Sequence, residues 1–394
     1  MIDAWLRIFG EALDAPVPDA YRIWQQAQKY LAEGNQGSAD RCERLTYVLH
    51  NSHIPNAVRM GPDVKFGYGG IGVVIHPSSD IGRGATIGAN VTLGGRTGAK
   101  RRITSDGQFK FAPLIEDYAY IATGAKILGG ITVGAMSIIG ANAVVIDDIP
   151  PLSIAAGVPA KIIGKITPEN ALSKKSTYLS ARAMPGDDFV AMVRYYGRDR
   201  SIDCLVDWGR PVGTHSYKLR RNIIQCPEEP GWPKAVDLNK EFTWKSINAW
   251  PQALQKWLHS LVTLRALLNH SSRAFHDVKS SVQILRAWRE ENSPTDSASA
   301  LAWDYETTAI RAEQVAAIWA FGFQDKWMET VIREHVERIN ASVPSNMRLK
   351  RGTALAALGK ATGDESMIAE AQQALSEARG DDTPAYFRLA ALVA

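Results

Sequence analysis

Three histidines near the start of the chain carry the side chain best suited to moving protons near neutral pH. His50 and His53 stand close together, and His76 follows Ile75 and precedes a proline. An imidazole at such a place can act as a general base and take the proton of a hydroxyl or an amine. A histidine before proline can instead hold a tight corner of the chain by a hydrogen bond. Both roles are open for His76, and His50 and His53 are further candidates for the base.

A short basic segment is the second feature that could take part in binding or catalysis. Residues 96–110 contain five basic side chains and one acidic one, so this segment alone accounts for the formal net charge of +4. That net charge is too small to indicate a nucleic-acid-binding protein. The segment either attracts an anionic coenzyme or glycan or forms an ordinary solvated loop. The residues are Arg96, Lys100, Arg101, Arg102, Asp106 and Lys110.

The cysteine content and the hydropathy of the sequence indicate the cellular compartment in which we expect the protein. Cys42, Cys204 and Cys226 lack metal-ligand spacing, so we expect no metal site, no disulfide framework and a reducing compartment. No apolar run approaches the roughly 20 residues that cross a bilayer, and the first residues do not read as a signal peptide. We therefore predict a cytoplasmic protein without a membrane span.

Aliphatic residues recur every six positions through the first half of the chain, a period that fits neither a helix nor an ordinary strand. Small or β-branched residues often follow four positions later, and glycine is frequent beside the aliphatic residue. Short strands joined by tight corners produce this pattern, and three of them close a triangular coil that must stack on others to bury its core. A fainter start at Val58 and Val64 and an end near 164 predict a parallel β-helix over 58–164. Its aliphatic positions are Ile75, Ile81, Ile87, Leu93, Ile115, Ile121, Ile127, Val133, Ile139 and Val145.

Five segments of this region resemble the left-handed β-helix hexapeptide acyltransferases, in particular the serine acetyltransferases and the related polysaccharide O-acetyltransferases. They are IHPSSDIGRGATIG at 75–88, VTLGG at 91–95, IATGAKILGGITVG at 121–134, IGANAVV at 139–145 and AAGVPAKIIG at 155–164. The resemblance implies a left-handed coil, transfer of an acetyl group from acetyl-coenzyme A (acetyl-CoA) without a metal, and a homotrimer with sites between protomers.

The resemblance also implies residues that bind the cofactor. Thr123, Gly124 and Ala141 match positions beside the pantetheine channel of the family, and Lys161 matches a position facing the nucleotide phosphates. Simple corner geometry is the alternative explanation for Thr123 and Ala141. A solvated lysine is the alternative for Lys161.

The family's catalytic histidines have no counterpart in this sequence. Aligning on VTLGG places Gly69 at the first histidine position, aligning on IHPSSDIGRG places Ala89 there, and Ala112 stands at the second. We take His76 as the candidate base. Because both family histidines are missing, we predict O-acetylation of a carbohydrate hydroxyl, in a capsular or exopolysaccharide, rather than of serine. The alternatives are a serine O-acetyltransferase and a noncatalytic trimeric protein that binds glycans or directs assembly.

The chain divides into a multi-domain arrangement. We predict an N-terminal helical segment over 1–57, the β-helix over 58–164, an irregular connector over 165–240 and an all-α domain over 241–394. The N-terminal helical spacing involves Trp5, Leu6, Phe9 and Leu13, then Tyr21, Trp24, Ala27, Tyr30 and Leu31. In the last domain we predict helices near 246–270, 274–291, 304–322, 326–340, 348–360 and 364–379.

The C-terminal domain resembles the α/α-toroid of heparinase II/III-like lyases over 244–258, 303–322 and 348–359. The Asn-His pair of that family reads Asn346-Met347 here. Nine of the eleven tryptophans follow the β-helix. They either fill a helical core or stack against sugars. Polysaccharide cleavage by this domain is a third functional prediction.

Overall fold

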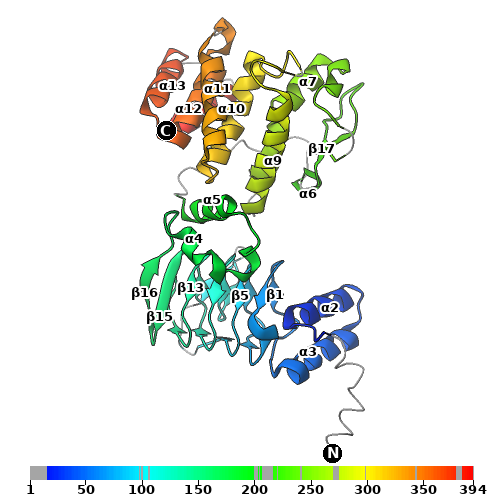
Figure 1. Cartoon of the computed structure of the whole chain (residues 1–394), viewed down its shortest axis with the longest axis vertical. Helices are drawn as coiled ribbons and strands as arrows, with labels where there is room; N and C mark the ends of the chain where they lie inside the picture. The colour runs from blue at the N-terminus through cyan, green and yellow to red at the C-terminus, as the bar shows by residue number, and fades with distance from the viewer. Residues whose placement is uncertain are drawn as a thin grey trace, which may run out of the picture. The chain divides into compact units, whose positions relative to one another are not determined.

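The computed structural model describes residues 16–96, 98, 101–104, 107–198, 203, 205, 216–219, 221–239, 242–268, 275–297, 299–341, 344–378 and 384–393. The chain separates into two compact units, Met1–Gly197 and Arg198–Ala394, each with its own core (Figure 1). The predicted helix around Trp5, Leu6, Phe9 and Leu13 and the third cysteine, Cys204, lie outside the described residues.

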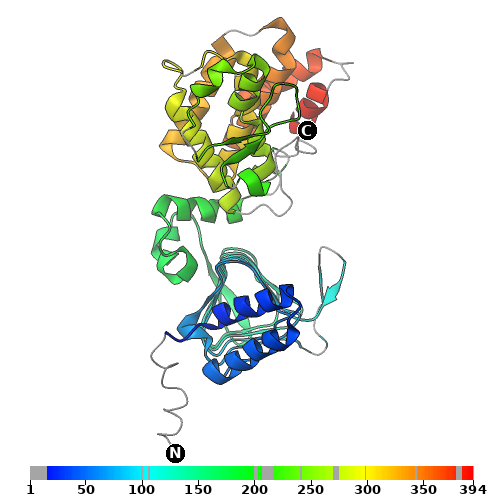
Figure 2. The same cartoon turned by 90° about the vertical axis from the view of Figure 1, so that its right-hand side faces the viewer.

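A parallel β-helix with three sheets forms most of the first unit, and Figure 2 shows its triangular outline seen along the stack of coils. One sheet has the order β1-β4-β9-β12, the second β14-β11-β6-β3, and the third β16-β15-β13-β10-β5-β2, in which only β16 is antiparallel. This arrangement of stacked parallel strands confirms the predicted parallel β-helix. The strands are β1 Arg59–Met60, β2 Lys65–Phe66, β3 Val74–Ile75, β4 Asp80–Ile81, β5 Thr86–Ile87, β6 Thr92–Gly94, β9 Leu114–Ile115, β10 Tyr120–Ile121, β11 Lys126–Leu128, β12 Thr132–Val133, β13 Ile138–Ile139, β14 Val144–Val145, β15 Ser153–Gly157 and β16 Ala160–Lys165.

The hexapeptide pattern is confirmed by burial. All ten predicted aliphatic positions are buried, none with more than 3% of its surface exposed. They stack in register from coil to coil, as Ile87, Ile121 and Ile139 show. The small residues four positions later, such as Ala85, are also buried because they line the inside of the corners. Each coil therefore contributes one layer to a continuous core.

The first coil departs from the six-residue period. Phe66, and not Val64, pairs with Ile87 and takes the aliphatic position, although Val64 is also buried. Ile75 follows Phe66 by nine positions instead of six, so the corner between them is longer than the others. The extra residues form the short 3-10 segment η1 (Gly67–Gly70). Tyr68, Gly69 and Gly70 all have positive φ there, a conformation that glycine adopts without strain.

Two helices precede the β-helix, and Figure 2 shows them across the end of the triangle. Helix α2 (Ala20–Ala32) confirms the second predicted N-terminal helix, and α3 (Gln36–His50) follows it closely because the Asn35 side chain caps its first turn. The Tyr21 hydroxyl donates to the Gly61 carbonyl oxygen at 2.9 Å, and the Trp24 indole N–H donates to that of Val58 at 3.2 Å. Helix α2 therefore closes the first coil.

The segment 165–240 differs from the irregular connector that we predicted. It contains α4 (Ala171–Lys174), η2 (Lys175–Thr177), η3 (Leu179–Ala181) and α5 (Gly186–Gly197) in the first unit, and α6 (Ser216–Leu219) with the β17 (Ile223–Gln225) and β18 (Ala235–Asp237) hairpin in the second. Tyr178 is buried and donates its hydroxyl to the Met136 carbonyl oxygen at 2.6 Å, and Phe189 packs against it. Burial of these aromatic rings orders residues 171–197 of this segment.

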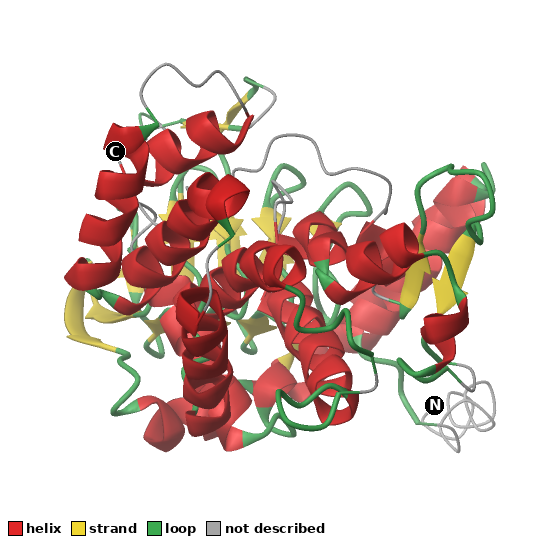
Figure 3. Ribbon diagram, turned by 90° about the horizontal axis from the view of Figure 1, so that it is seen from above, coloured by secondary structure: helices red, strands yellow, loops and turns green. Residues whose placement is uncertain are grey.

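The second unit is mainly helical, and Figure 3 shows its helices packed side by side. The predicted helices are confirmed except the first, which is split where Pro251 precedes α7 and Leu261 takes a positive φ after it. Helices α10 and α12 are buried over most of their length and form its core. The elements are η5 Ser246–Ala249, α7 Gln252–His259, η6 Val262–Leu264, α8 Arg265–Leu268, α9 Phe275–Glu291, α10 Tyr305–Ala320, α11 Lys326–Ala341, η7 Ser345–Met347, α12 Arg348–Thr362, α13 Glu365–Glu377 and α14 Pro384–Val393.

The tryptophans of the second unit favour the core interpretation. Trp244, Trp288 and Trp303 are buried, and the other described tryptophans are half-buried. None of the tryptophans that the structure describes is exposed. The fully buried Arg311 guanidinium lies 3.9 Å from the centre of the Trp288 ring. The buried rings of Trp244, Trp288 and Trp303 therefore act in packing, where large aromatic side chains contribute most.

Candidate functional site

Three of the four predicted cofactor-binding residues lie together at one edge of the β-helix. This edge is the row of corners that follow β2, β5, β10 and β13, residues 67–70, 88–90, 122–124 and 140–142, and we call it the Thr123 edge. Thr123 and Ala141 are exposed in successive coils, joined by a hydrogen bond of 3.0 Å from the Asn142 N–H to the Thr123 carbonyl oxygen. The structure therefore places exposed positions in a line along the stack.

Gly124 is required by the packing of this edge. Its φ is +78°, and a Cβ added there would lie 1.9 Å from the Asn142 Oδ1 atom. Any side chain would collide with the neighbouring corner, so the glycine lets two coils approach closely.

Lys161 lies at the end of the same sheet. It is exposed on β16, opposite Ala156 of β15, and β15 pairs with β13 next to Ala141. Its ammonium group thus provides a positive charge beyond the last corner of the Thr123 edge, where it can meet an anion.

His76 lies at a different edge of the β-helix. It follows β3, whose sheet is β14-β11-β6-β3, and is half-buried. Its Nδ1 atom accepts a hydrogen bond of 3.1 Å from the Ser78 backbone N–H. In the neutral ring the proton is then on Nε2. This geometry is the corner-stabilising role that we kept as the alternative, and the structure does not bring His76 to the predicted cofactor-binding residues.

The basic segment forms a hairpin anchored to the β-helix. Strands β7 (Arg102–Ile103) and β8 (Phe109–Lys110) pair with each other, and Figure 2 shows the hairpin projecting from the triangle. Arg102 and Lys110 form ion pairs with Asp80 of β4, and Arg59 joins them. Burial alone would raise the pKa of Asp80, but hydrogen bonds from these three cations outweigh it and lower the pKa to about 2. Two of the five basic side chains, Arg102 and Lys110, therefore stabilise the attachment of the hairpin to the β-helix.

The positions matched to the family's histidines hold no titratable group. Ala89 and Ala112 are buried, and Gly69 forms part of the long first corner. Another histidine lies beside Gly69: a Cβ added to Gly69 would be 3.2 Å from Cε1 and 3.6 Å from Nδ1 of His50. No periodic pattern predicts this contact, because His50 ends α3, outside the repeat. His53 is exposed, and its backbone forms a bridge to Val74.

Among the described residues, no group of three or more His, Cys, Asp or Glu side chains is placed to hold a metal ion. Cys42 and Cys226 are free, buried thiols. No helix in the described ranges has the length and apolar character that a membrane crossing needs.

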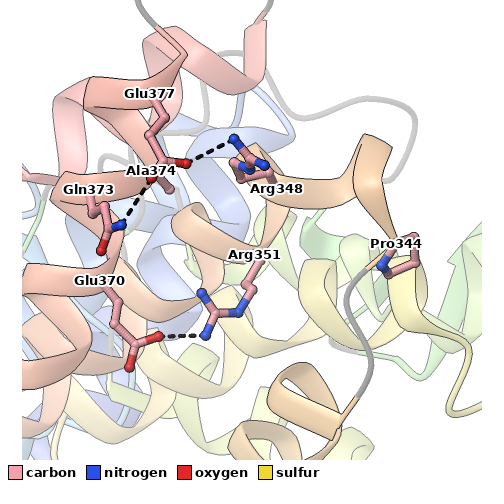
Figure 4. Close-up of a pocket in the computed structure, with 7 residues that line it drawn as sticks. All are labelled: Pro344, Arg348, Arg351, Glu370, Gln373, Ala374 and Glu377. Carbon is pink, nitrogen blue, oxygen red and sulfur yellow. Dashed lines mark hydrogen bonds and ion pairs between the residues drawn. The ribbon is translucent and has the colours of Figure 1, made fainter.

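A cavity of about 330 Å³ in the second unit lies between α12 and α13 (Figure 4). Its charged side chains pair with one another: Arg348 with Glu377 at 2.8 Å, and Arg351 with Glu370 at 2.5 Å. These ion pairs join the two helices, so the cavity presents balanced charge rather than a site for an ion.

Comparison with known sequences identifies the relatives of this chain. No protein-family model matches it. It is 46% identical to a serine acetyltransferase of Bacillus subtilis over 94 residues, which is 24% of this chain and 40% of the relative. It is 37% identical to that of Mycobacterium tuberculosis over 152 residues, 38% of this chain and 58% of the relative. The chain thus spans about half the length, or less, of these relatives.

The serine acetyltransferase of Helicobacter pylori is matched over more of its length. The identity is 35% over 142 residues, which cover 32% of this chain and 78% of the relative. Among solved structures, a serine acetyltransferase from Vibrio cholerae matches with a TM-score of 0.33 and 28% identity over 41% of this chain and 56% of that one. A structural likeness at this TM-score adds nothing to the match in sequence.

These relatives overturn our main functional prediction. The prediction that the protein acetylates a capsular or exopolysaccharide hydroxyl is wrong. The matched proteins are serine acetyltransferases, and this activity was the alternative that we had placed second. We had inferred a carbohydrate from the missing histidines, and that inference assumed that a base can stand only at the family's positions. With 78% of the Helicobacter pylori protein matched at 35% identity, the chain belongs to the serine acetyltransferase family.

Proposed function

We propose that the protein is a serine O-acetyltransferase that takes its acetyl group from acetyl-CoA. The observation that carries the proposal is the match to serine acetyltransferases, which reaches 35% identity over 78% of the Helicobacter pylori relative. The acyltransferase domain is the β-helix over 58–164, and the hydroxyl of serine is the acceptor.

The Thr123 edge supports the proposal as the place where the coenzyme binds. Thr123 and Ala141 are exposed one coil apart, and Gly124 lets their two corners pack closely, without a side chain between them. Lys161 stands at the end of the row and can pair with a phosphate. A pantetheine arm is a narrow, extended chain, so a line of small exposed corners suits it.

The proposal includes a homotrimer with sites between protomers, as the family resemblance implies. It also includes a cytoplasmic location, which the free thiols Cys42 and Cys226 support because disulfides are rare in that compartment. The toroid likeness of 241–394 stays a prediction about fold, and we attach no activity to it.

The test is an assay of thiol release. Purified full-length protein is mixed with acetyl-CoA and L-serine, and free coenzyme A is followed with a thiol reagent. We expect release that depends on both substrates, and formation of O-acetylserine by mass spectrometry. D-serine and L-alanine are the controls, since the first has the wrong configuration and the second lacks the hydroxyl.

A noncatalytic protein is the competing outcome. Isothermal titration calorimetry with coenzyme A distinguishes the two: binding without turnover on serine would leave a binding protein. Absence of both binding and turnover would overturn the proposed function.

A further inference from the structure

We propose that His50 is the general base of the transferase, an inference that rests on the proposed function. The residue ends α3, in front of the β-helix, yet its imidazole lies against the long first corner at Gly69. That corner belongs to the Thr123 edge. The base therefore comes from a helix, and the coil that it serves needs no histidine of its own.

The hydrogen bond of the imidazole selects the tautomer. His50 Nε2 lies 2.8 Å from the carbonyl oxygen of Pro18, just ahead of α2. A carbonyl oxygen can only accept, so Nε2 carries the proton and donates it. In the neutral ring Nδ1 is then the basic nitrogen. Among the described residues Nδ1 has no hydrogen-bond partner, so its lone pair is available.

Gly69 gives access to that nitrogen. A Cβ at this position would lie 3.6 Å from Nδ1 and 3.2 Å from Cε1, in front of the ring. Glycine places no side chain against this edge of the ring, and its φ of +76° disfavours other residues. His50 is 6% exposed overall, and Gly69 lies against the edge of the ring that carries Nδ1 and Cε1.

The position of the base relative to the predicted cofactor residues follows from the register of the coils. Phe66 of β2 pairs with Ile87 of β5, and Ile87 pairs with Ile121 of β10, so the Gly69 corner lies two coils before Thr123. Neighbouring parallel strands are about 4.8 Å apart, which puts the two corners on the order of 10 Å apart along the edge. An extended pantetheine arm along the Thr123 edge has the length to bring a thioester toward Gly69.

The backbone around His50 is fixed to the corner. The Gly72 N–H donates to the His50 carbonyl oxygen at 2.9 Å. The buried Ser52 hydroxyl oxygen accepts from the Val73 N–H at 2.9 Å and lies 2.5 Å from the Gly70 carbonyl oxygen. These bonds tie the end of α3 to residues 70–73, which follow Gly69. A catalytic side chain held in this way needs little reorganisation during the reaction.

Transfer of the acetyl group to serine can be written in full with His50 as the base. His50 Nδ1 takes the proton of the serine hydroxyl as the oxygen attacks the thioester carbonyl carbon. A C–O bond forms, and the C–S bond then breaks. The leaving thiolate takes the proton from the imidazolium, so the products are O-acetylserine and coenzyme A and the imidazole is neutral again. The Pro18 carbonyl oxygen stabilises the imidazolium through the Nε2 proton.

The variant H50Q tests the proposal with the least structural change. The glutamine amide can still donate toward Pro18 but cannot accept a proton. General-base catalysis contributes about 10²- to 10⁴-fold, so we expect kcat to fall by that range with KM for acetyl-CoA within about threefold. H76Q and H53Q are the matched controls and should keep kcat within about twofold. In H50A, added imidazole should restore part of the rate, which a purely structural histidine would not allow.

Each outcome decides between explanations. Normal kcat in folded H50Q, or a loss of the expected size in H76Q instead, overturns the assignment of His50. If the wild type transfers nothing to serine, hydrolysis of acetyl-CoA by water is measured. Hydrolysis by the wild type but not by H50Q keeps the base and removes serine as acceptor. No thiol release from the wild type with either acceptor overturns both the base and the proposed function.

Discussion

The Nζ atom of Lys110 lies 2.9 Å from both carboxylate oxygens of Asp80, and this contact attaches the C-terminal end of strand β8 to strand β4 of the β-helix. Arg102 of β7 binds the same carboxylate and also donates to the Ala112 carbonyl oxygen at 2.8 Å. The hairpin thus returns to the β-helix beside Ala112 with both of its strands tied to one acidic side chain. Asp80 is the electrostatic anchor of this loop.

Replacement of Asp80 should therefore destabilise the protein in a pH-dependent way. In the folded state the pKa of Asp80 is lowered to about 2 because hydrogen bonds from Arg59, Lys110 and Arg102 outweigh burial. The unfolded carboxyl titrates near 3.9, so the interaction is fully present above that pH and is lost as the pH falls toward 2. We expect D80N to lose about 2 kcal/mol or more of unfolding free energy at pH 7.

Urea unfolding of wild type and D80N between pH 7 and 2.5 measures this effect. The difference between the two should shrink below about pH 4. D63N is the control, since Asp63 is exposed and its distance to Arg83 is 3.5 Å; a change within about 0.5 kcal/mol is expected there. A constant difference between wild type and D80N at all pH values would contradict the role of the charge.

Lys161 should affect coenzyme binding through its charge. We expect K161E to raise KM for acetyl-CoA several-fold and to reduce the dependence of KM on salt, because the attraction between the ammonium group and a phosphate is screened by ions. Steady-state kinetics from 20 to 300 mM NaCl measures both. K165E is the matched control, because Lys165 is exposed on the same strand near its other end. Equal effects of the two variants would argue for general charge attraction instead of a phosphate contact at Lys161.

A bulky side chain at Ala141 should block the Thr123 edge. Ala141 is exposed at the corner one coil beyond Thr123, so A141F would fill the line in which we place the pantetheine arm. We expect calorimetry to show at least about tenfold weaker binding of coenzyme A, or about 1.4 kcal/mol, without a large change in melting temperature. D147F, at an exposed corner that follows β14 on another edge, should bind normally. Equal affinity of A141F and the wild type would place the coenzyme elsewhere.

His259 should make the second unit sensitive to acid. It is fully buried, and its Nδ1 atom accepts from the Trp288 indole N–H at 3.1 Å. Burial, aided by the nearby Arg311 charge, lowers the pKa of His259 to about 3. An unfolded histidine takes up its proton near pH 6.5, so between these values the unfolded state binds more protons and stability falls with decreasing pH.

His259 should contribute about 1.4 kcal/mol to the unfolding free energy for each pH unit below about 6, measured by denaturant unfolding followed through tryptophan fluorescence. In H259N, which keeps an acceptor for Trp288, this contribution should disappear and the curve should flatten. An unchanged slope in a folded H259N protein would show that other groups cause the acid sensitivity.

The β-helix could be predicted from the amino-acid sequence, because a six-residue period places one aliphatic side chain on each strand and leaves few other ways to bury these side chains. Ile75, Ile121 and Ile139 could be assigned to the core from spacing alone, and all are fully buried. The motif residues Thr123, Gly124 and Ala141 could also be placed at one edge, since equal spacing brings equivalent corners into line. Most helices of the second unit could also be predicted, because their apolar residues recur at helical spacing.

Which histidine lies on the Thr123 edge became known only from the three-dimensional packing. His76 is inside the repeat but turns to another corner, where the Ser78 N–H occupies its Nδ1 atom. His50 is outside the repeat, and only the packing of α2 and α3 on the first coil brings it to Gly69 and Pro18. Contacts between segments that share no period depend on how helices and coils pack in three dimensions, and local spacing carries no record of that packing.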